Sequence, residues 1–364
     1  MPRLDTLSSP PVACISAAVL ILWFGAAGVV AQPFAYITEA LDGTVAVVDL
    51  GQTPPAVATR LTVGSLPIGV AVAPAGDRVY VTNSGDGTVS VIDIAQNPPQ
   101  VIHTVTVGDE PNGVVVSPDG DTVYVANYSG NTVSVIDVSP AVPAVVATVP
   151  VGEQPEGVAV DAAGNRLYVG NSEDFGATGS TVSVIDLTGV TPAVVDTIDT
   201  EPETHGILVA PDGRLWVATS DSSNLAVIDT GTNTVQHTVA AGDRPYGLAI
   251  SPDGTRAYTS NPEVGTVTIV DMTVEPPVAI GTIPGVLNVI GLDTSDDGSR
   301  LYTVSLDDTQ LEVFNVSVTP PVSLGTVGLG GLPVGYGQFV APLGALIFAD
   351  GFESGDLTAW SPQI

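Results

Sequence analysis

The chain has 364 residues, 44% of them hydrophobic but only 5% aromatic, with 40 glycines and 30 prolines. It carries 8 Lys and Arg residues against 39 Asp and Glu residues, a formal net charge of −31. This field repels phosphate backbones and anionic membranes, which argues against a nucleic-acid partner. It is compatible with high salt, with Ca²⁺ around the molecule, or simply with solubility. No long stretch has apolar residues at helical spacing, so we expect no amphipathic helix.

Residues 1–31 have the composition of a secretory signal peptide. Arg3 precedes the apolar run Val12–Val30, and small residues up to Ala31 suit a signal peptidase. An uncleaved membrane anchor is the alternative, because the apolar run is long. The only cysteine, Cys14, lies in this segment, so a cleaved chain has no disulfide, thiolate nucleophile or Cys-ligated metal. We therefore expect an exported protein that is periplasmic, extracellular or associated with the cell surface.

Residues 107–137 form the unit that the chain repeats. Three runs rich in Val, Ile or Tyr are separated by Ser117-Pro118-Asp119-Gly120 and by a second turn at 127–131. Pro presets φ for a turn, Asp bonds its own backbone and Gly accepts positive φ. A fourth run follows, as in Val145–Val151. The pattern predicts a four-stranded antiparallel meander, which cannot bury both its faces alone.

The unit occurs seven times along the chain. The aromatic residue of the second strand recurs at spacings of 44, 44, 44, 48, 42 and 44 residues: Tyr36, Tyr80, Tyr124, Tyr168, Trp216, Tyr258 and Tyr302. A glycine opens each first strand: Gly69, Gly113, Gly157, Gly206, Gly247, Gly291 and Gly335. An acid closes each third strand, with one Asn variant: Asp49, Asp93, Asp137, Asp186, Asp229, Asp271 and Asn315. This period predicts an all-β, seven-bladed β-propeller of four-stranded antiparallel blades, whereas an open solenoid would need capping units.

The order of the strands indicates how the ring closes. The chain after residue 31 starts at a second strand, Ala35–Thr38, and ends at a first strand, Gly335–Val340. We expect that C-terminal strand to complete the N-terminal blade, which removes the open edges. The propeller then spans 32–342, and 343–364 form a C-terminal tail with a possible sorting or docking role. Phe348 offers an alternative, in which a strand around it joins the closing blade.

Several runs carry a family resemblance. VYVTN (79–83), VYVAN (123–127) and LYVGN (167–171), together with PNGVVVSPDG (111–120), resemble the YVTN-type β-propeller repeat family. The resemblance covers roughly residues 35–341 and implies the propeller fold. That wider group includes bacterial surface or periplasmic propellers, lactonase-like hydrolases and propeller domains attached to redox enzymes. The fold alone does not choose among these functions.

No catalytic constellation stands out in the sequence. His103 and His237 fall in predicted fourth strands, at the outer edge of a blade, where we expect ordinary surface residues. HExxH, GxSxG, CxxCH and phosphate-loop motifs do not occur. Ser295-Asp296-Asp297-Gly298 and the related turns look like fragments of a Ca²⁺ loop, but the turn role suffices. The sequence therefore makes no cofactor evident, leaves Ca²⁺ possible without a motif, and leaves any metal unknown.

The informative residues are those that vary where the repeat is otherwise regular. The residue before the marker glycine should sit at the channel mouth, where four successive blades carry polar or aromatic groups and three carry aliphatic ones. The aliphatic side includes Ile68, Ile290 and Val334. The predicted ligand-binding residues are Asp109, Glu110, Asn112, Glu153, Glu156, Glu203, His205, Asp243, Arg244 and Tyr246. A ligand with a cationic or hydroxyl-rich end and an apolar end would suit this mouth, as would a metal held by Glu156, Glu203 and His205.

Three functions remain open at this point. The first is a non-catalytic binding or interaction scaffold, a monomer whose partner is an unknown protein, small molecule or glycan. The second is a lactonase-like hydrolase, in which His205 and Glu156 would activate water by general-base catalysis. The third is a propeller partner of a separate redox enzyme. Charged loops that merely keep a solvated mouth wet are the alternative to any binding site.

Overall fold

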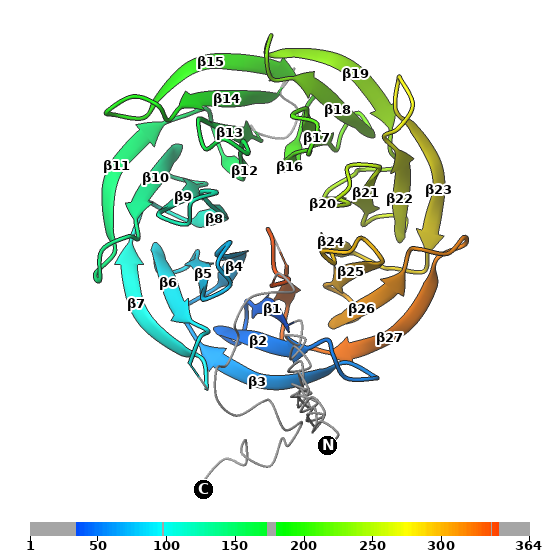
Figure 1. The fold of residues 1–364 in the computed structure, drawn as a ribbon, viewed down its shortest axis with the longest axis horizontal. Coiled ribbons are helices and arrows are strands. Elements are labelled where there is room, and N and C mark those ends of the chain that lie inside the picture. Colours follow the sequence, from blue (N-terminus) through cyan, green and yellow to red (C-terminus); the bar gives the residue numbers. More distant parts are fainter. Residues whose placement is uncertain (1–33, 97, 173–179, 336, 342–364) are drawn as a thin grey trace, which may run out of the picture. The chain divides into compact units, whose positions relative to one another are not determined.

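The computed structural model describes residues 34–96, 98–172, 180–335 and 337–341. Every regular element in these ranges is a β-strand, and the strands form seven four-stranded antiparallel sheets. The sheets are the blades of a propeller, arranged around a central axis with one strand of each at the centre (Figure 1). The predicted seven-bladed all-β fold is thereby confirmed. The predicted signal peptide, the tail with Phe348, and residues 173–179 lie outside the described residues.

We number the blades in chain order, each from its inner to its outer strand. Blade 1 contains β28 (Pro333–Val334), β1 (Phe34–Glu39), β2 (Thr44–Asp49) and β3 (Ala56–Thr62), and blade 2 contains β4 (Pro67–Val72), β5 (Arg78–Asn83), β6 (Thr88–Asp93) and β7 (Gln100–Thr106). Blade 3 contains β8 (Pro111–Val116), β9 (Thr122–Asn127), β10 (Thr132–Asp137) and β11 (Ala144–Pro150), and blade 4 contains β12 (Pro155–Val160), β13 (Arg166–Asn171), β14 (Ser180–Asp186) and β15 (Ala193–Thr200). Blade 5 contains β16 (Thr204–Val209), β17 (Leu215–Thr219), β18 (Asn224–Asp229) and β19 (Thr234–Ala240). Blade 6 contains β20 (Leu248–Ile250), β21 (Arg256–Asn261), β22 (Thr266–Asp271) and β23 (Val278–Pro284), and blade 7 contains β24 (Val289–Thr294), β25 (Arg300–Ser305), β26 (Gln310–Asn315) and β27 (Val322–Gly328).

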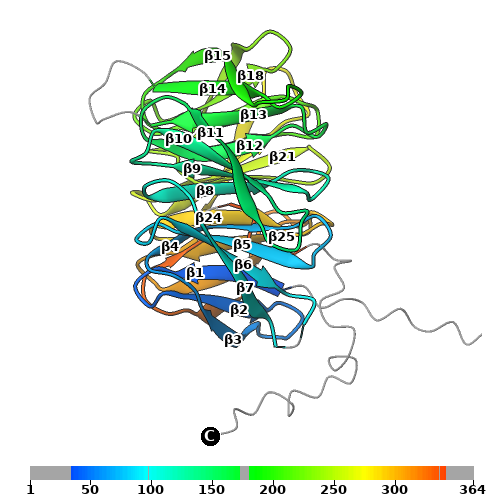
Figure 2. The ribbon, with the colours of Figure 1, turned by 90° about the vertical axis from the view of Figure 1, so that its left-hand side faces the viewer.

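The hydrophobic core lies between the blades. The seven marker aromatics of the second strands are each at most 5% exposed, and Val, Ile and Leu from neighbouring blades pack around them in successive clusters. Figure 2 shows the ring from its side, with the blades following one another from β3 to β15. Burial on both faces explains why the inner strands read as continuous apolar runs. The described residues include no helix long and apolar enough to cross a bilayer.

Two repeated polar residues are explained by local bonds. The acid that closes each third strand accepts the backbone N–H two residues later, and Asn315 does the same, so the marker is the first residue of an Asx-type turn. The final Asn of the second strand is fully buried: Asn127 accepts the N–H of Gly108 and donates to Thr132 and Ser134. Both residues therefore specify the blade rather than a ligand.

Blade 1 closes the ring as the sequence predicts, but its inner strand is irregular. Thr38 pairs with Val334 and Ala35 with Val340, so the closing strand advances six residues (334 to 340) while β1 advances three (38 to 35). In blade 3 the equivalent pairings differ by a single residue (111 to 114 against 127 to 125). The closing segment therefore bulges into the channel, where a Cβ on Gly337 would meet the carbonyl oxygen of Val70 at 2.4 Å.

Asp293 of blade 7 fastens this bulge. Its Oδ2 accepts the backbone N–H groups of Phe339 at 3.0 Å and Val340 at 2.9 Å. The other blades carry an apolar residue at this position, such as Ala71 or Ala159. Burial raises the pKa of Asp293 to about 7, against the opposing effect of these backbone donors. Asp293 thus clamps the strand that closes the ring.

Candidate functional site

The ten predicted site residues all lie in or beside the loops that enter the inner strands of blades 3 to 6, on one face of the ring. The structure brings together Glu156, His205 and Tyr246, and it joins Glu203 to Arg244. Asp109, Glu153 and Asp243 are exposed on the same loops. Glu110 accepts a hydrogen bond from Ser129, and the backbone oxygen of Asn112 accepts one from Thr82 at 2.8 Å.

The marker glycines fix where these side chains begin. A Cβ on Gly113 would lie 2.1 Å from the carbonyl oxygen of Glu156, so only glycine lets blade 3 approach blade 4 this closely. The same contact joins Gly206 to the carbonyl oxygen of Tyr246, whose distance from a Cβ would be 2.6 Å. The backbone of Glu156 and of Tyr246, each the residue before a marker glycine, is therefore held against the marker glycine of the preceding blade. Glu156, His205 and Tyr246 occupy three successive positions of this kind.

These three side chains form a compact unit at the channel mouth. Nδ1 of His205 lies 2.8 Å from Oε2 of Glu156, and the hydroxyl of Tyr246 donates to Oε1 of the same carboxylate. The rings of His205 and Tyr246 stack with centroids 4.3 Å apart and an interplanar angle of 26°. Glu156 is only 7% exposed. A buried carboxylate thus holds both rings, and it fixes the orientation of the imidazole.

The pKa shifts in this unit favour an ion pair. Burial alone would raise the pKa of Glu156, but the charge and hydrogen bond of His205 and the hydroxyl of Tyr246 outweigh it and lower that pKa. Burial alone would lower the pKa of His205, but Glu156, with a contribution from Glu203, raises it. Both shifts favour a glutamate carboxylate beside an imidazolium. The predicted Glu156–His205 pair is therefore formed in the structure.

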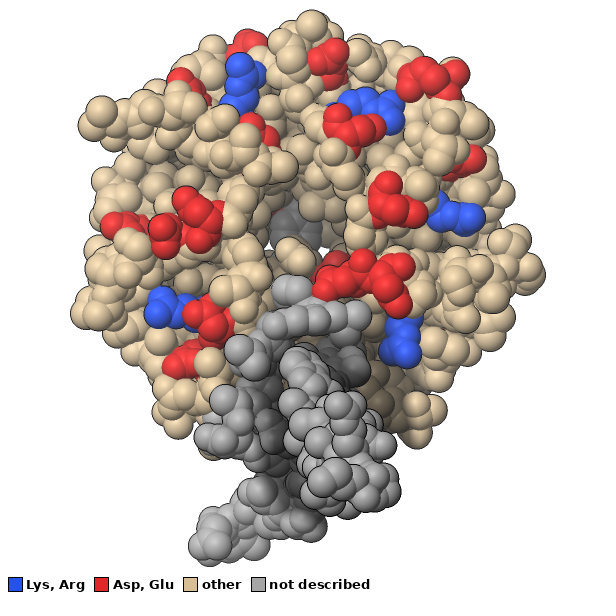
Figure 3. Space-filling model, in the orientation of Figure 1, with Lys and Arg blue, Asp and Glu red and all other residues tan. Residues whose placement is uncertain are grey.

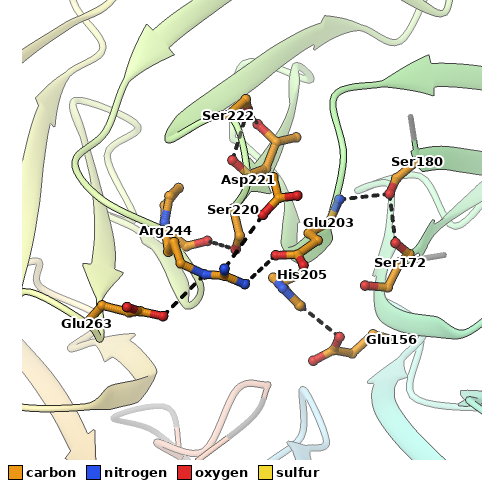
Figure 4. A network of polar contacts seen from close by, with 12 residues as sticks. Glu156, Ser172, Ser180, Glu203, His205, Ser220, Asp221, Ser222, Arg244 and Glu263 are labelled. Atoms are coloured by element: carbon orange, nitrogen blue, oxygen red, sulfur yellow. Dashed lines mark hydrogen bonds and ion pairs between the residues drawn. The ribbon is translucent and has the colours of Figure 1, made fainter. Parts of the chain in front are cut away.

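A second cluster lies beside His205 (Figure 4). The guanidinium of Arg244 lies 2.6 Å from Glu203, 3.6 Å from Asp221 and 3.5 Å from Glu263. Burial, together with the charge of Asp221, raises the pKa of Glu203 even though Arg244 opposes the shift. Oε1 of Glu203 is buried and has no hydrogen-bond partner. Three carboxylates thus share one arginine at this edge of the mouth.

The other half of the mouth is apolar, as its sequence predicts. Ile68, Ile290 and Val334 pack with Ala40, Leu306 and the ring of Tyr246. Tyr246 therefore joins the two halves, with its hydroxyl on Glu156 and its ring on aliphatic side chains. The described residues contain no group of three or more His, Cys, Asp or Glu side chains arranged to hold a metal ion. Glu156, Glu203 and His205, which the sequence suggests as metal ligands, therefore do not form such a group.

A cavity of about 590 Å³ occupies the channel itself. First-strand residues of blades 2 to 7 line it, among them Ala71, Val115, Leu208 and Asp293, but Glu156, His205 and Tyr246 do not. Figure 3 shows one face of the ring, with acidic and basic side chains side by side around a central hollow. The site residues thus lie at the mouth rather than on the cavity wall.

Sequence reasoning missed three residues of this region. Asp221 and Glu263 lie in second-to-third-strand turns, and only the folded loops show that they face Arg244. Asp293 could have been found, because it replaces an apolar residue of the repeat. His103 and His237 lie on the outer strands β7 and β19, where the sequence places them, and His237 contacts Glu275.

Comparison with known proteins shows which protein family the sequence matches. The sequence profile described as "Cytochrome D1 heme domain" matches residues 31–246, which is more than half of the chain and includes Glu156, His205 and Tyr246. No curated protein matches the chain. Among solved structures, a chain of Kuenenia stuttgartiensis hydrazine synthase is 23% identical with a TM-score of 0.67, covering 78% of this chain and 92% of that one. A functionally unknown protein from Desulfotomaculum acetoxidans is 16% identical with a TM-score of 0.71, covering 82% and 97%. At these identities the two structures support the fold alone.

The family match corrects the cofactor expectation. The sequence makes no cofactor evident because it lacks CxxCH and other spaced motifs, yet the matching profile is that of a heme domain. A heme that is not covalently attached needs only an axial side chain from the fold, and a single ligand leaves no spacing pattern in the sequence. The expectation of no cofactor was therefore wrong. The YVTN resemblance is consistent at the level of a propeller family and is not shown beyond it.

Proposed function

Because the chain belongs to the family of the cytochrome D1 heme domain, we propose that it is an exported redox propeller that binds a heme-type cofactor at its channel mouth. The observation that carries the proposal is the contact of 2.8 Å between Nδ1 of His205 and the buried Glu156. His205 is the histidine at the inner edge of a blade, whereas His103 and His237 lie on outer strands. His205 is therefore the residue that would hold the iron.

The residues around His205 suit this role. Metal-ligating histidines commonly donate their second N–H to a carboxylate, which fixes the tautomer and the ring orientation. In the imidazolium that these pKa shifts favour, both nitrogens carry a proton, so a metal would displace the proton of Nε2 while the Nδ1–H of His205 stays on Glu156. Tyr246 keeps Glu156 in place through its hydroxyl and supports the imidazole by stacking. A bound heme supplies one-electron chemistry at its iron.

The charges at the mouth restrict the kind of cofactor. Arg244 is the one arginine among the predicted site residues, and its guanidinium already lies against Glu203, Asp221 and Glu263. The acid groups of a heme would add negative charge if they were held in this cluster, so they would not be the groups through which these residues hold the cofactor. The donor set therefore fits a cofactor held by its metal at His205, with an apolar surface against Ile68 and Ile290.

Titration with ferric heme tests the proposal. The protein should give a saturable shift of the Soret band, and His205→Ala should lose it and regain it when free imidazole is added. His103→Ala is the matched control, because it removes a histidine from the outer strand β7, and it should titrate like the parent protein. A parent protein that gives no saturable band, or a His205→Ala variant that binds as tightly as its parent, would refute the heme site.

A propeller chain that works with a separate redox enzyme is the second candidate. The similarity in fold to a chain of hydrazine synthase, which is an enzyme, motivates this candidate. In this case the protein would contribute an interaction surface, and its mouth would carry no heme. Purification from the compartment in which the protein is made, followed by identification of a stoichiometric enzyme subunit, would support this candidate. Absence of such a subunit from a heme-loaded sample would count against it.

A further inference from the structure

The loops around the mouth share an unusual backbone conformation. The third residue before each marker glycine has a φ between 44° and 58°, although none of these residues is glycine: Leu66, Glu110, Gln154, Glu203, Arg244, Asn288 and Leu332. This left-handed region is unfavourable for most L-residues, above all for bulky ones. Two of the seven are leucines that point into solvent, with 44% of Leu66 and 39% of Leu332 exposed. The fold thus displays leucine where Asn or Gly would be less strained.

These two leucines are among four exposed leucines on neighbouring loops of this face, which we call the leucine arc: Leu41, Leu66, Leu287 and Leu332. Leu41 is 70% exposed and Leu287 is 52% exposed. The turn that carries Leu41 lies between the other loops, because Leu41 N–H donates to Gly331 at 3.2 Å and Val63 N–H donates to Gly43 at 2.9 Å. The leucine arc therefore extends over the loops of neighbouring blades 7, 1 and 2.

Carboxylates inside this arc brace the loops. Asp42 accepts the N–H of Gly331 at 2.8 Å, and Asp86 accepts that of Ser65 at 2.7 Å. Asp307 accepts a side-chain N–H of Asn288 at 3.0 Å. These bonds hold the leucines on ordered loops, which lowers the entropy that a partner must offset when it binds.

The rest of the same face is acidic. Exposed carboxylates follow one another on the loops of blades 3 to 6, and we call them the acidic arc: Asp109, Glu110, Glu153, Asp221, Asp243 and Glu263. Exposed leucines therefore gather on one side of a face that carries exposed carboxylates on both sides, including Asp42, Asp86 and Asp307 among the leucines. Exposed apolar patches with a polar border are typical of protein interaction sites.

We propose that this face docks a partner protein that presents an apolar patch beside a cluster of lysine or arginine residues. Charge complementarity selects this occupant: a second copy of the chain, with its net charge of −31, would bring acidic arc against acidic arc. An anionic membrane would be repelled in the same way. The redox character of the partner rests on the proposed function, whereas the docking chemistry does not depend on bound heme.

A minimal probe of this chemistry is a helical peptide with leucine on one face and lysine on the other. Calorimetry should show it binding the parent protein, with an affinity that falls as salt is added. Leu41→Ser, Leu66→Ser and Leu332→Ser together should weaken binding by roughly tenfold or more. Glu110→Gln, Glu153→Gln and Asp243→Asn together should weaken it and flatten the salt dependence. The control combines Val142→Ser, Val190→Ser and Val278→Ser, which change exposed valines away from these loops and should bind like the parent.

Three results would overturn the proposal. The first is a leucine variant that keeps its near-ultraviolet circular dichroism and its peptide affinity. The second is equal binding of a matched peptide of leucine and glutamate. The third is loss, in the leucine variant, of self-association or of binding to anionic vesicles, which would assign the face to those occupants. Because calorimetry needs no heme, failure of docking and failure of heme binding are separate results.

Discussion

Asn127 and Glu156 are both buried polar residues on inner parts of the ring, yet they serve different ends. Asn127 makes three hydrogen bonds, to Gly108, Thr132 and Ser134, and the same residue type recurs at Asn83, Asn171 and Asn261. Glu156 has no counterpart in the repeat and is bound by side chains from two other blades. In a repeat protein, a buried polar residue that recurs in the repeats stabilises the fold of each repeat. A buried polar residue found in one repeat only indicates a role that the other repeats do not share.

Asp293 refines this comparison. It is as unusual within the repeat as Glu156, but it bonds to backbone N–H groups of the closing strand. In a closed ring, a buried polar residue that differs from its counterparts in the other blades can therefore belong either to a functional site or to the closure of the ring. The bonding partners separate them, because Glu156 contacts titratable side chains and Asp293 contacts backbone.

The largest expected effect is on the recurring residue. Asn127→Ala removes three hydrogen bonds at a fully buried position and leaves the N–H of Gly108 without its acceptor, so it should lower the free energy of unfolding by about 2–4 kcal/mol. Urea denaturation measures this. Asn261→Ala is the matched control, because Asn261 donates twice but its Oδ1 has no partner. Asn261→Ala should lower the free energy of unfolding by less than Asn127→Ala does. An equal or larger decrease would show that the hydrogen bond accepted by Asn127 contributes nothing to stability.

The second prediction concerns Asp293 and pH. Its pKa is raised from 3.8 to about 7, so the folded protein binds this proton more tightly than the unfolded chain does. Stability from this group is therefore fully present below about pH 4 and is lost as pH rises to about 7. Asn at this position keeps an oxygen acceptor without the charge.

The measurement is the free energy of unfolding of the parent and of Asp293→Asn across this range. The free energy of unfolding of the variant, relative to that of the parent, should rise by about 2–4 kcal/mol between pH 4 and pH 7. Val115→Asn is the control, because it places the same side chain at the equivalent first-strand position of blade 3 without removing a carboxylate, and its pH dependence should stay parallel to that of the parent. If the free energy of unfolding of Asp293→Asn also ran parallel to that of the parent across this pH range, the pKa of Asp293 would not be raised in the folded protein, and the contacts of its carboxylate with the closing strand would be wrong.

The periodic part of the molecule was accessible from sequence, whereas the contacts between loops were not. Tyr124 and its equivalents, the turn at 117–120 and the strand order at the two ends predict the blades, their number and the closure. The position before each marker glycine also placed Glu156, His205 and Tyr246 at one mouth, because equivalent positions in a ring converge. The approach of Asp221 and Glu263 to Arg244 depends on loop conformations that no period encodes. The heme-domain family was missed because a heme that is not covalently attached leaves no spacing pattern in the sequence.

The smallest expected effect separates strain from docking on the leucine arc. Leu66→Asn relieves a left-handed backbone with φ 48°, because Asn tolerates this region, but it also loses the buried part of a side chain that is 44% exposed. The relief of backbone strain and the loss of buried apolar surface should nearly cancel, so the free energy of unfolding should change by less than about 0.5 kcal/mol. Val101→Asn is the comparison, with 37% exposure beside the register shift of strand β7, where the backbone has no positive φ to relieve, and it should lower the free energy of unfolding by about 1 kcal/mol. If Leu66→Asn cost as much as Val101→Asn, leucine would be present at this loop for stability, and the argument that the fold displays it for a partner would lose its support.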